Sequence, residues 1–378
     1  MILGSHDLPG PIVFLAPMAG ISDRPFRSLC RSLGASAAVS EMLTSDTRLW
    51  HTAKSRNRLD HHGEAGPRIV QLLGNQPDAL ALAARANVSR GADIIDLNLG
   101  CPAKKVCNNA AGSALLADEA LVERLLLALT AAVRVPVTLK MRLGIDREHI
   151  NADRIAVIAE TAGVAMISVH GRTRACGYRG QVDLDGIARV VDAVRIPVLA
   201  NGDIASPEDA RAVIQRTGAA GVMVGRAAQG RPWLPGQIRA GLSDLPIPPA
   251  PVGADLGRLI RAHVTAVHEQ YGSERGLRIA RKHIGWYLEH NRPDVDRRPF
   301  LAITDARGQL AALAALFGES AASQMKPGRD PNKNPSDPRG EMPHELLDAC
   351  CSRPQRKWPT GVDGHSLPTR GIRQDRDG

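Results

Sequence analysis

The chain of 378 residues exceeds the usual size of one domain, so we expect one large domain with an appendage. Apolar residues make up 43% and aromatic residues 3%, which excludes a wholly disordered chain and predicts a core of Ala, Leu, Val and Ile. The formal net charge of +9 suits a polyanionic partner such as nucleic acid, and the sequence predicts neither a secretion signal nor a membrane span.

Eight short β-type runs recur at nearly even spacing along the first 225 residues. Helix-like segments separate them, and the last of these opens with a Ser-Pro-Glu capping signal. The strands are expected at Ile12–Ala16, Ala37–Glu41, Arg68–Leu72, Ile94–Asn98, Val137–Lys140, Met166–His170, Val198–Asn201 and Gly221–Gly225. The clearest helices are expected at Asp118–Val133, Asn151–Ala162, Asp183–Val194 and Ser206–Arg216.

Strict alternation of strand and helix predicts a parallel sheet, and eight units in about 240 residues predict its closure into a (β/α)8 TIM barrel. A doubly wound open sheet is the alternative. Most of the strands finish on polar or small residues, which a barrel would bring together at one face. The predicted barrel domain covers residues 1–243.

A Pro-rich linker is predicted at 244–254, followed by a small helical domain at 255–319. Residues 320–378 are rich in Pro and Gly and poor in aliphatic residues, which predicts a disordered tail.

Six cysteines lie at positions 30, 101, 107, 176, 350 and 351. They form no CxxC pair and have no His at metal-ligand spacing, so we expect no metal site, no disulfide framework and a reducing cytoplasm as the setting. Cys101 follows Asn98 and a glycine turn at the exit of the fourth strand. Such a cysteine can be a nucleophile, a general acid or a small buried residue.

Glycine turns end the seventh and eighth strands, at Asn201-Gly202-Asp203 and Gly225-Arg226. Barrels bind phosphate at this place, although glycine is also common in ordinary βα turns. Lys140 is expected at the barrel mouth, where a cation could stabilise an electron-rich ring; the alternative is a solvated lysine. His170 could contact the same ring or be structural, with Arg172 and Arg174 reaching phosphates outside.

Arg278, Arg281 and Lys282 share one face of a predicted helix at spacings i, i+3 and i+4. A basic stripe of this kind can bind a nucleic-acid backbone, or it can be a solvated face.

Several of these motifs together resemble the tRNA-dihydrouridine synthases, most closely the bacterial B-type subgroup. The resemblance covers roughly residues 10 to 319 and rests on six motifs in order: Ala16-Pro17-Met18-Ala19-Gly20, Asn98-Leu99-Gly100-Cys101-Pro102, Lys140-Met141-Arg142, His170-Gly171-Arg172-Thr173, Ala200-Asn201-Gly202-Asp203 and Gly225-Arg226-Ala227. Nothing in the 320–378 extension, including Cys350-Cys351, matches the family.

The resemblance implies FMN as cofactor, NADPH or NADH as reductant, and tRNA as substrate. Cys101 maps onto the family's active-site acid, which protonates C5 of a D-loop uracil while hydride reaches C6. The implied FMN-binding residues are Pro17, Met18, Ala19, Gln71, Lys140, His170, Asn201, Gly202, Asp203, Gly225 and Arg226. The residues expected to contact tRNA are Asn98, Arg142, Arg172, Arg174, Arg278, Arg281 and Lys282.

Two other functions fit parts of this pattern. An FMN barrel that reduces a free pyrimidine or enone would use similar strand-end residues but has no need of a basic helical domain. A tRNA-binding chaperone with a vestigial flavin site would have no need of Cys101 and Lys140. We expect a cytoplasmic monomer with no obligatory protein partner.

Overall fold

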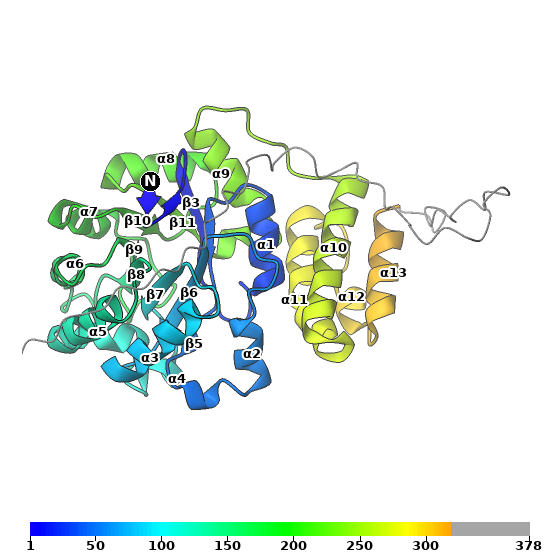
Figure 1. Ribbon diagram of the computed structural model, residues 1–378. Coiled ribbons are helices and arrows are strands. Elements are labelled where there is room, and N and C mark those ends of the chain that lie inside the picture. Colours follow the sequence, from blue (N-terminus) through cyan, green and yellow to red (C-terminus); the bar gives the residue numbers. More distant parts are fainter. Residues whose placement is uncertain (319–378) are drawn as a thin grey trace, which may run out of the picture. The chain divides into compact units, whose positions relative to one another are not determined.

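The structure, a computed structural model, describes residues 1–318; the predicted tail and its Cys350-Cys351 pair lie outside this range. Eight parallel strands form the expected barrel, closed by the pairing of β4 with β6 (Figure 1). They are β3 (Ile12–Leu15), β4 (Ala37–Val39), β6 (Arg68–Leu73), β7 (Ile94–Leu99), β8 (Val137–Arg142), β9 (Met166–His170), β10 (Val198–Asn201) and β11 (Gly221–Val224). The predicted TIM barrel is confirmed, and every strand lies within two residues of its expected bounds.

Helices surround the barrel, and the four that the sequence predicted most clearly each lie within one residue of expectation. Ser206 accepts a hydrogen bond from the amide of Asp209 at 3.0 Å, which confirms the capping signal. The surrounding α-helices are α1 (Arg24–Ser32), α2 (Ala53–Leu59), α3 (Pro77–Val88), α4 (Lys104–Cys107), α5 (Glu119–Ala132), α6 (Ala152–Thr161), α7 (Leu184–Ala193), α8 (Pro207–Thr217) and α9 (Leu234–Leu242).

Short elements that the sequence did not predict complete this part of the chain. A hairpin of two-residue strands, β1 (Ile2–Leu3) and β2 (His6–Asp7), precedes the barrel. The two-residue strand β5 (Leu43–Thr44) pairs in parallel with the C-terminal end of β6. The short 3-10 helices are η1 (Thr47–Leu49), η2 (Gly112–Ala117) and η3 (Arg226–Ala228). Elements of two to six residues carry too little periodicity to be read from sequence.

Two apolar layers follow from the alternation of side chains along each strand. On β3, Val13 and Leu15 point outward into the layer between strands and helices, whereas Ile12 and Phe14 fill the barrel interior. Leu3 packs into the interior cluster from the hairpin and is almost fully buried. The barrel is therefore a packed core, and ligands have access only at its mouth.

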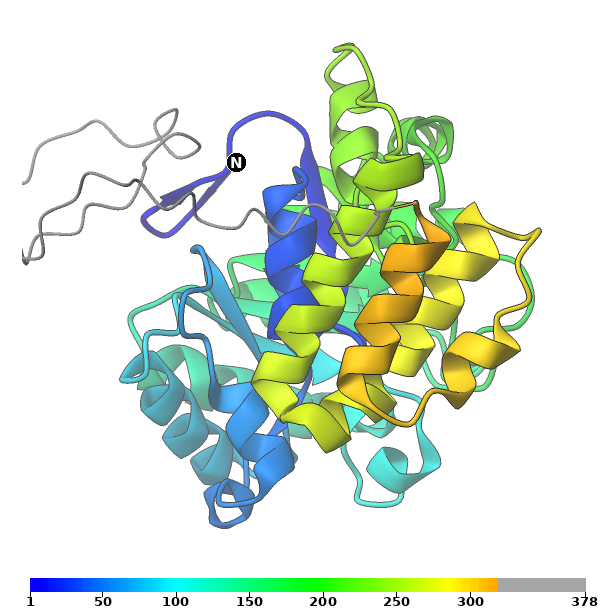
Figure 2. The same cartoon turned by 90° about the vertical axis from the view of Figure 1, so that its right-hand side faces the viewer.

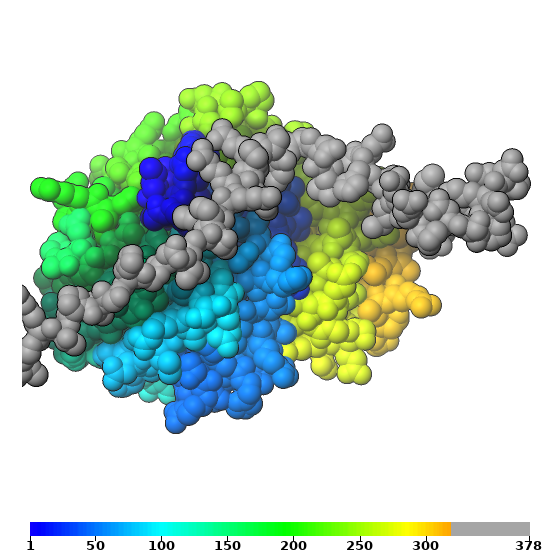
Figure 3. Space-filling model, viewed as in Figure 1, coloured from blue at the N-terminus to red at the C-terminus, as the bar shows by residue number. Residues whose placement is uncertain are grey.

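Four further helices follow the irregular segment 243–252 and gather beside the barrel (Figures 1 and 2). They are α10 (Gly253–Tyr271), α11 (Ser273–Asn291), α12 (Arg298–Ala302) and α13 (Ala306–Leu316). Helix α1 of the barrel packs against α10, and the Phe26 ring contacts the buried rings of His263 and His283. The yellow surface of these helices adjoins the blue surface of the N-terminal segments in Figure 3. Among residues 1–318, no helix combines the length and the apolar character needed to cross a membrane.

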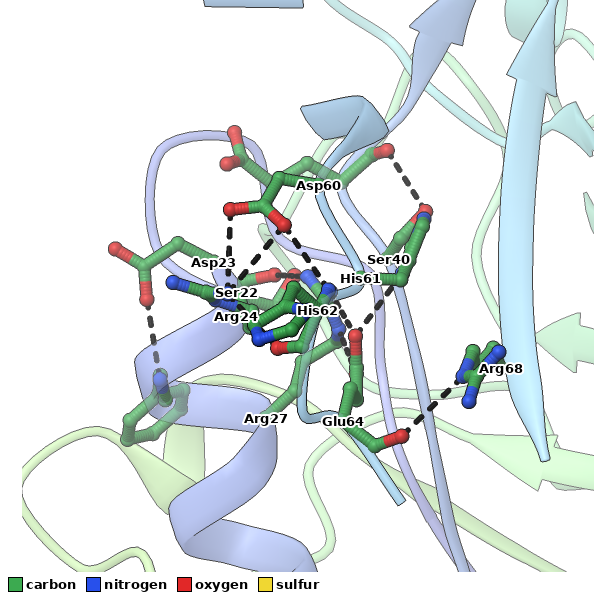
Figure 4. A network of polar contacts seen from close by, with 12 residues as sticks. Ser22, Asp23, Arg24, Arg27, Ser40, Asp60, His61, His62, Glu64 and Arg68 are labelled. Carbon is green, nitrogen blue, oxygen red and sulfur yellow. Dashed lines mark hydrogen bonds and ion pairs between the residues drawn. The ribbon is translucent and has the colours of Figure 1, made fainter. Parts of the chain in front are cut away.

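A buried ion pair fastens α1 to the loop before β6 (Figure 4). Arg27 donates two hydrogen bonds of 2.6 Å to the carboxylate of Glu64, and both side chains are 4% exposed. The His61 ring lies 3.0 Å from the same carboxylate. Burial alone would raise the pKa of Glu64, but the hydrogen bonds from His61 and Arg27 outweigh it and bring that pKa to about 2.

We predict that Glu64→Gln lowers the free energy of unfolding by about 3 kcal/mol at pH 7, because it leaves the Arg27 charge buried without its partner. The folded-state pKa of Glu64 lies below its unfolded value, so this stability is present above about pH 4.5 and is lost as the pH falls toward 2. Urea unfolding at a series of pH values measures both effects. Glu289→Gln, which removes the half-exposed partner of Arg297, is the matched control and should change little. Equal stability of the two variants at pH 7 would contradict the assignment.

Candidate active site

The carboxyl ends of the barrel strands surround a pocket of about 850 Å³, a volume suited to a cofactor together with part of a substrate. Fourteen of the residues singled out from the sequence line it: Pro17, Met18, Ala19, Gln71, Asn98, Cys101, Lys140, Arg142, His170, Asn201, Gly202, Asp203, Gly225 and Arg226. Five others do not: Arg172, Arg174, Arg278, Arg281 and Lys282.

A chain of hydrogen-bonded side chains links the buried Asp96 to the pocket residues Gln71 and Asn98. Gln71 donates to Asp96 at 2.7 Å, and Asn98 donates to the side-chain oxygen of Gln71 at 2.7 Å. Burial raises the pKa of Asp96 to about 6, although hydrogen bonds from Thr138 and Gln71 oppose the rise. Asp96 fixes which way the Gln71 amide faces, and Gln71 in turn orients Asn98.

The loop that carries Cys101 is held by three side chains. Asn98 accepts hydrogen bonds from the amides of Gly100, at 3.1 Å, and Cys101, at 2.9 Å. Arg142 donates to the carbonyl of Gly100 at 2.7 Å, and the Ser113 hydroxyl donates to the carbonyl of Cys101 at 2.8 Å. The amide and the carbonyl of Cys101 are therefore both held, so the backbone that carries the thiol has a defined position at the pocket wall.

Burial is the main influence on the Cys101 thiol, and it raises its pKa. The nearby charges of Arg142 and Lys140 act in the opposite direction but are outweighed. The thiol is therefore protonated at neutral pH, which favours a proton donor over a thiolate nucleophile.

Lys140 is buried rather than solvated, with 9% of the residue exposed. Its ammonium donates to the side-chain oxygen of Asn201 at 3.0 Å, and Asn201 donates to the carbonyl of Met223 at 2.7 Å. Burial, followed by the charge of Arg142, lowers the pKa of Lys140 to about 8. Most of this lysine remains charged at pH 7, so it presents a cation within the pocket.

His170 lies among four cations and is uncharged. Burial, together with the charges of Lys140, Arg142, Arg172 and Arg226, lowers its pKa to about 2. The neutral ring can donate one hydrogen bond and accept another.

Arg142 and Arg172 are almost completely buried, with 1% and 3% of each residue exposed. Arg142 donates to the carbonyls of Gly100, Thr173 and Gly177, and Arg172 bonds to Asp203 and to carbonyls of the loop 179–180. Their placement favours a role in holding loops over the direct contact with tRNA expected from sequence. Arg226 also bonds Asp203, at 3.2 Å, but is half exposed and faces the pocket.

The basic stripe of α11 does not present three equivalent cations to solvent. Arg278 is exposed, whereas Arg281 is partly buried and donates to the carbonyl of Ile303 at 2.9 Å. The Lys282 ammonium donates to the carbonyl of Gly20, beside the pocket. Of the stripe, only Arg278 is placed as the sequence prediction requires. Arg174, on the loop after β9, is partly buried.

Tyr178 is the main pocket residue that the sequence reasoning missed. Its ring is exposed, and the guanidinium carbons of Arg226 and Arg142 lie 4.7 and 5.5 Å from the ring centroid. The signal available in the sequence was an aromatic residue between Gly177 and Arg179 in a strand-end loop. Asp96 was missed as well, although a carboxylate inside an apolar strand is itself unusual.

The family model described as dihydrouridine synthase (Dus) matches residues 14–322 of the chain. A tRNA-dihydrouridine synthase B from Pseudomonas aeruginosa is 52% identical over 323 residues, which cover 84% of this chain and 96% of that protein. The Yersinia pestis protein of the same name is 52% identical, with 84% of this chain and 99% of that protein covered. A Pseudomonas syringae relative, also so named, is 56% identical over 73% of this chain and 82% of its own length. The chain belongs to the dihydrouridine synthase family and is similar to its bacterial B-type members.

Proposed function

We propose that the protein is an FMN-dependent tRNA-dihydrouridine synthase that uses NADPH to reduce the C5–C6 double bond of a uridine in the tRNA D-loop. The observation that carries the proposal is the place of Cys101 at the wall of a pocket that Lys140 and His170 also line, and burial raises the pKa of its thiol. NADH would serve the same chemistry if the nicotinamide site accepts it.

The pocket suits an anionic ring system with a phosphate. Lys140 supplies a buried cation, and Arg226 supplies a second near the mouth. Gly202 has a φ of +133°, and a Cβ there would press on Val182 and the His170 ring, so glycine is required at this turn of the pocket wall. We assign the flavin contacts to Pro17, Met18, Ala19, Gln71, Lys140, His170, Asn201, Gly202, Asp203, Gly225 and Arg226. When bound, the flavin supplies the hydride for C6 of the uracil, after NADPH has reduced it.

Cys101 then completes the reduction by moving a proton. Its Sγ–H bond breaks as the C5–H bond forms, and the thiolate is reprotonated from solvent. Asn98 uses its side-chain oxygen to hold the Cys101 backbone and one amide hydrogen to meet Gln71. Its second amide hydrogen is the one that we assign to the uracil.

A stacked uridine cannot reach this pocket, so the nucleotide must swing out of the tRNA at a cost of roughly a few kcal/mol. Tyr178 offers an exposed ring at the pocket mouth between two arginines. We propose that this ring stacks on the extruded base or on its neighbour, which would offset part of the cost.

Cations on α2, α4 and α11 lie close enough to influence one another, and we propose that they contact tRNA phosphates. The pKa of Lys54 on α2 is lowered first by the charge of Arg58, and also by burial and by the charges of Lys105 on α4 and Arg275 on α11. Lys54 and Lys105 are exposed, as is Arg278 on α11. Since tRNA is the proposed substrate, we expect a cytoplasmic enzyme, acting as a monomer without a protein partner.

The reductase of a free pyrimidine and the tRNA-binding chaperone are less favoured. The dihydrouridine synthase family model matches residues 14–322 and so extends through the helical part, which a small-molecule reductase would not need. A chaperone would not need the buried Lys140 or the fixed thiol.

We predict that Cys101→Ala keeps its flavin and its yellow colour but forms dihydrouridine at least about a hundredfold more slowly, because the proton donor is gone. The assay uses tRNA that lacks the modification, with mass spectrometric detection. NADPH oxidation by the bound flavin, measured on the same sample, is the control and should persist. Full dihydrouridine formation by the alanine variant would rule out the assigned role.

The protonation state of the thiol can be tested by alkylation. Cys176 is partly buried, and a hydrogen bond of 3.1 Å from the Thr173 hydroxyl is the main cause that lowers its pKa. Burial raises the pKa of Cys101. We therefore expect iodoacetamide at pH 7.5 to modify Cys176 before Cys101, as read by peptide mass mapping. Faster modification of Cys101 would indicate a thiolate and a different mechanism.

We predict that replacing both Lys54 and Lys105 with Ala weakens tRNA binding and reduces the salt slope, log Kd against log salt, by about 1 to 2. Flavin content should not change, because neither residue lines the pocket. Arg216→Ala, which removes an exposed cation on α8, is the matched charge control. An unchanged salt slope in the double variant would exclude this surface from the tRNA path.

A further inference from the structure

The turn after β3 forms one wall of the pocket through Pro17, Met18 and Ala19. It is compact, since the amides of Ile21 and Ser22 both donate to the carbonyl of Met18 at 2.9 Å. The Ser22 hydroxyl closes the turn from the other side by accepting from the Met18 amide at 2.8 Å.

Both peptide groups of Gly20, the residue at the tip of this turn, are bonded to distant side chains. Its amide donates to the Glu41 carboxylate at 2.5 Å, and the same oxygen accepts from Arg58 at 2.8 Å. Its carbonyl accepts from the ammonium of Lys282, which lies 262 residues later in the chain, on α11. Gly20 has a φ of +75°, and a Cβ added there would lie 3.6 Å from the Lys282 ammonium. A helix outside the barrel therefore covers the tip of the turn.

The charges around Lys282 explain why this cation faces inward. Asp23 and Glu41 are both buried, and their charges raise the pKa of Lys282, whereas burial, the largest influence, lowers it. Tyr271, from α10, also faces Asp23, and its pKa is raised by burial first and then by Asp23 and Glu41. Two buried carboxylates need a nearby cation, and Lys282 supplies one in addition to the arginines of the barrel.

Lys282 differs in this respect from Arg278, which stands one helical turn earlier on α11. Arg278 is exposed, as a contact with tRNA phosphate would require. Lys282 has its ammonium bonded to the protein and its neighbour His283 buried against Phe26 of α1. The same basic stripe thus contains one cation that faces outward and one that faces the pocket wall.

We propose that Lys282 is a positioning residue for the flavin, holding the Gly20 turn so that Pro17 to Ala19 keep the shape of the cofactor pocket. The helical part of the chain is then a component of the flavin site as well as a tRNA-binding element. This inference rests on the proposal that the pocket binds flavin against this turn. Lys282 then supports the flavin pocket and is no longer among the residues that we expect to contact tRNA.

The test compares Lys282→Met, Lys282→Arg and the control Arg278→Met, each purified as the full chain with its flavin. One measurement is flavin release on dilution, which is monitored by the increase in the fluorescence of free FMN. The other is amide hydrogen exchange of residues 17–23, with α5 to α8 as the internal reference. Exchange can also be measured on each variant without flavin, so a wild-type protein that bound no flavin would refute the proposed function while the turn could still be tested.

We expect Lys282→Met to raise the flavin Kd at least about tenfold and to speed exchange in 17–23 alone, because a charged hydrogen bond to the turn is lost. Lys282→Arg should recover most of the affinity, and Arg278→Met should match the wild type in flavin affinity and in exchange of residues 17–23. Three results would overturn the proposal: unchanged affinity and exchange in Lys282→Met, a change in only one of these two measurements, or faster exchange throughout the barrel.

Discussion

The side-chain oxygen of Asn98 accepts hydrogen bonds from two successive amides, those of Gly100 and Cys101, and so converts a flexible glycine turn into a fixed one. Its own orientation is set by Gln71, and that of Gln71 by Asp96. These residues come from β6 and β7, which are hydrogen-bonded neighbours in the barrel. Residues on two rigid strands thus determine where the backbone of Cys101 lies. Proton transfer to a defined carbon atom requires such an arrangement.

A second constraint is the balance of charge in the pocket. Burial first, and then the charges of Lys140, Arg142, Arg172 and Arg226, hold His170 in its neutral form. The same positive field would favour an anionic cofactor and a phosphate. It does not ionise Cys101, because burial has the larger influence on that thiol. One pocket can therefore hold an anion and keep an acid protonated a short distance away.

Much of this arrangement could be predicted from the sequence because barrel strands impose strong rules. Eight apolar runs at even spacing predicted the closed barrel, and the polar residues at their ends were expected to meet at one face. Lys140 and Cys101 do line one pocket. This prediction needs only local information, because a residue at the end of a barrel strand lies at the barrel mouth wherever the rest of the chain packs.

Long side chains away from strand ends were harder to place. The helical spacing of Arg278, Arg281 and Lys282 showed that they share a face, but not what that face meets. Packing of α10 against α1 brings α11 close to the barrel, so Lys282 reaches the Gly20 carbonyl instead of solvent. Arg172 likewise turns inward because Asp203 and the loop 179–180 accept its donors. The spacing of residues along the sequence does not reveal such hydrogen-bond partners, because they come from distant parts of the chain.

The central claim is that this protein converts a tRNA uridine to dihydrouridine, and the most direct test is position-resolved mapping of dihydrouridine in tRNA from cells with and without the gene. Dihydrouridine is expected to disappear from a D-loop position on deletion and to return when the wild-type gene is restored. An identical dihydrouridine map in the two strains would contradict the central claim.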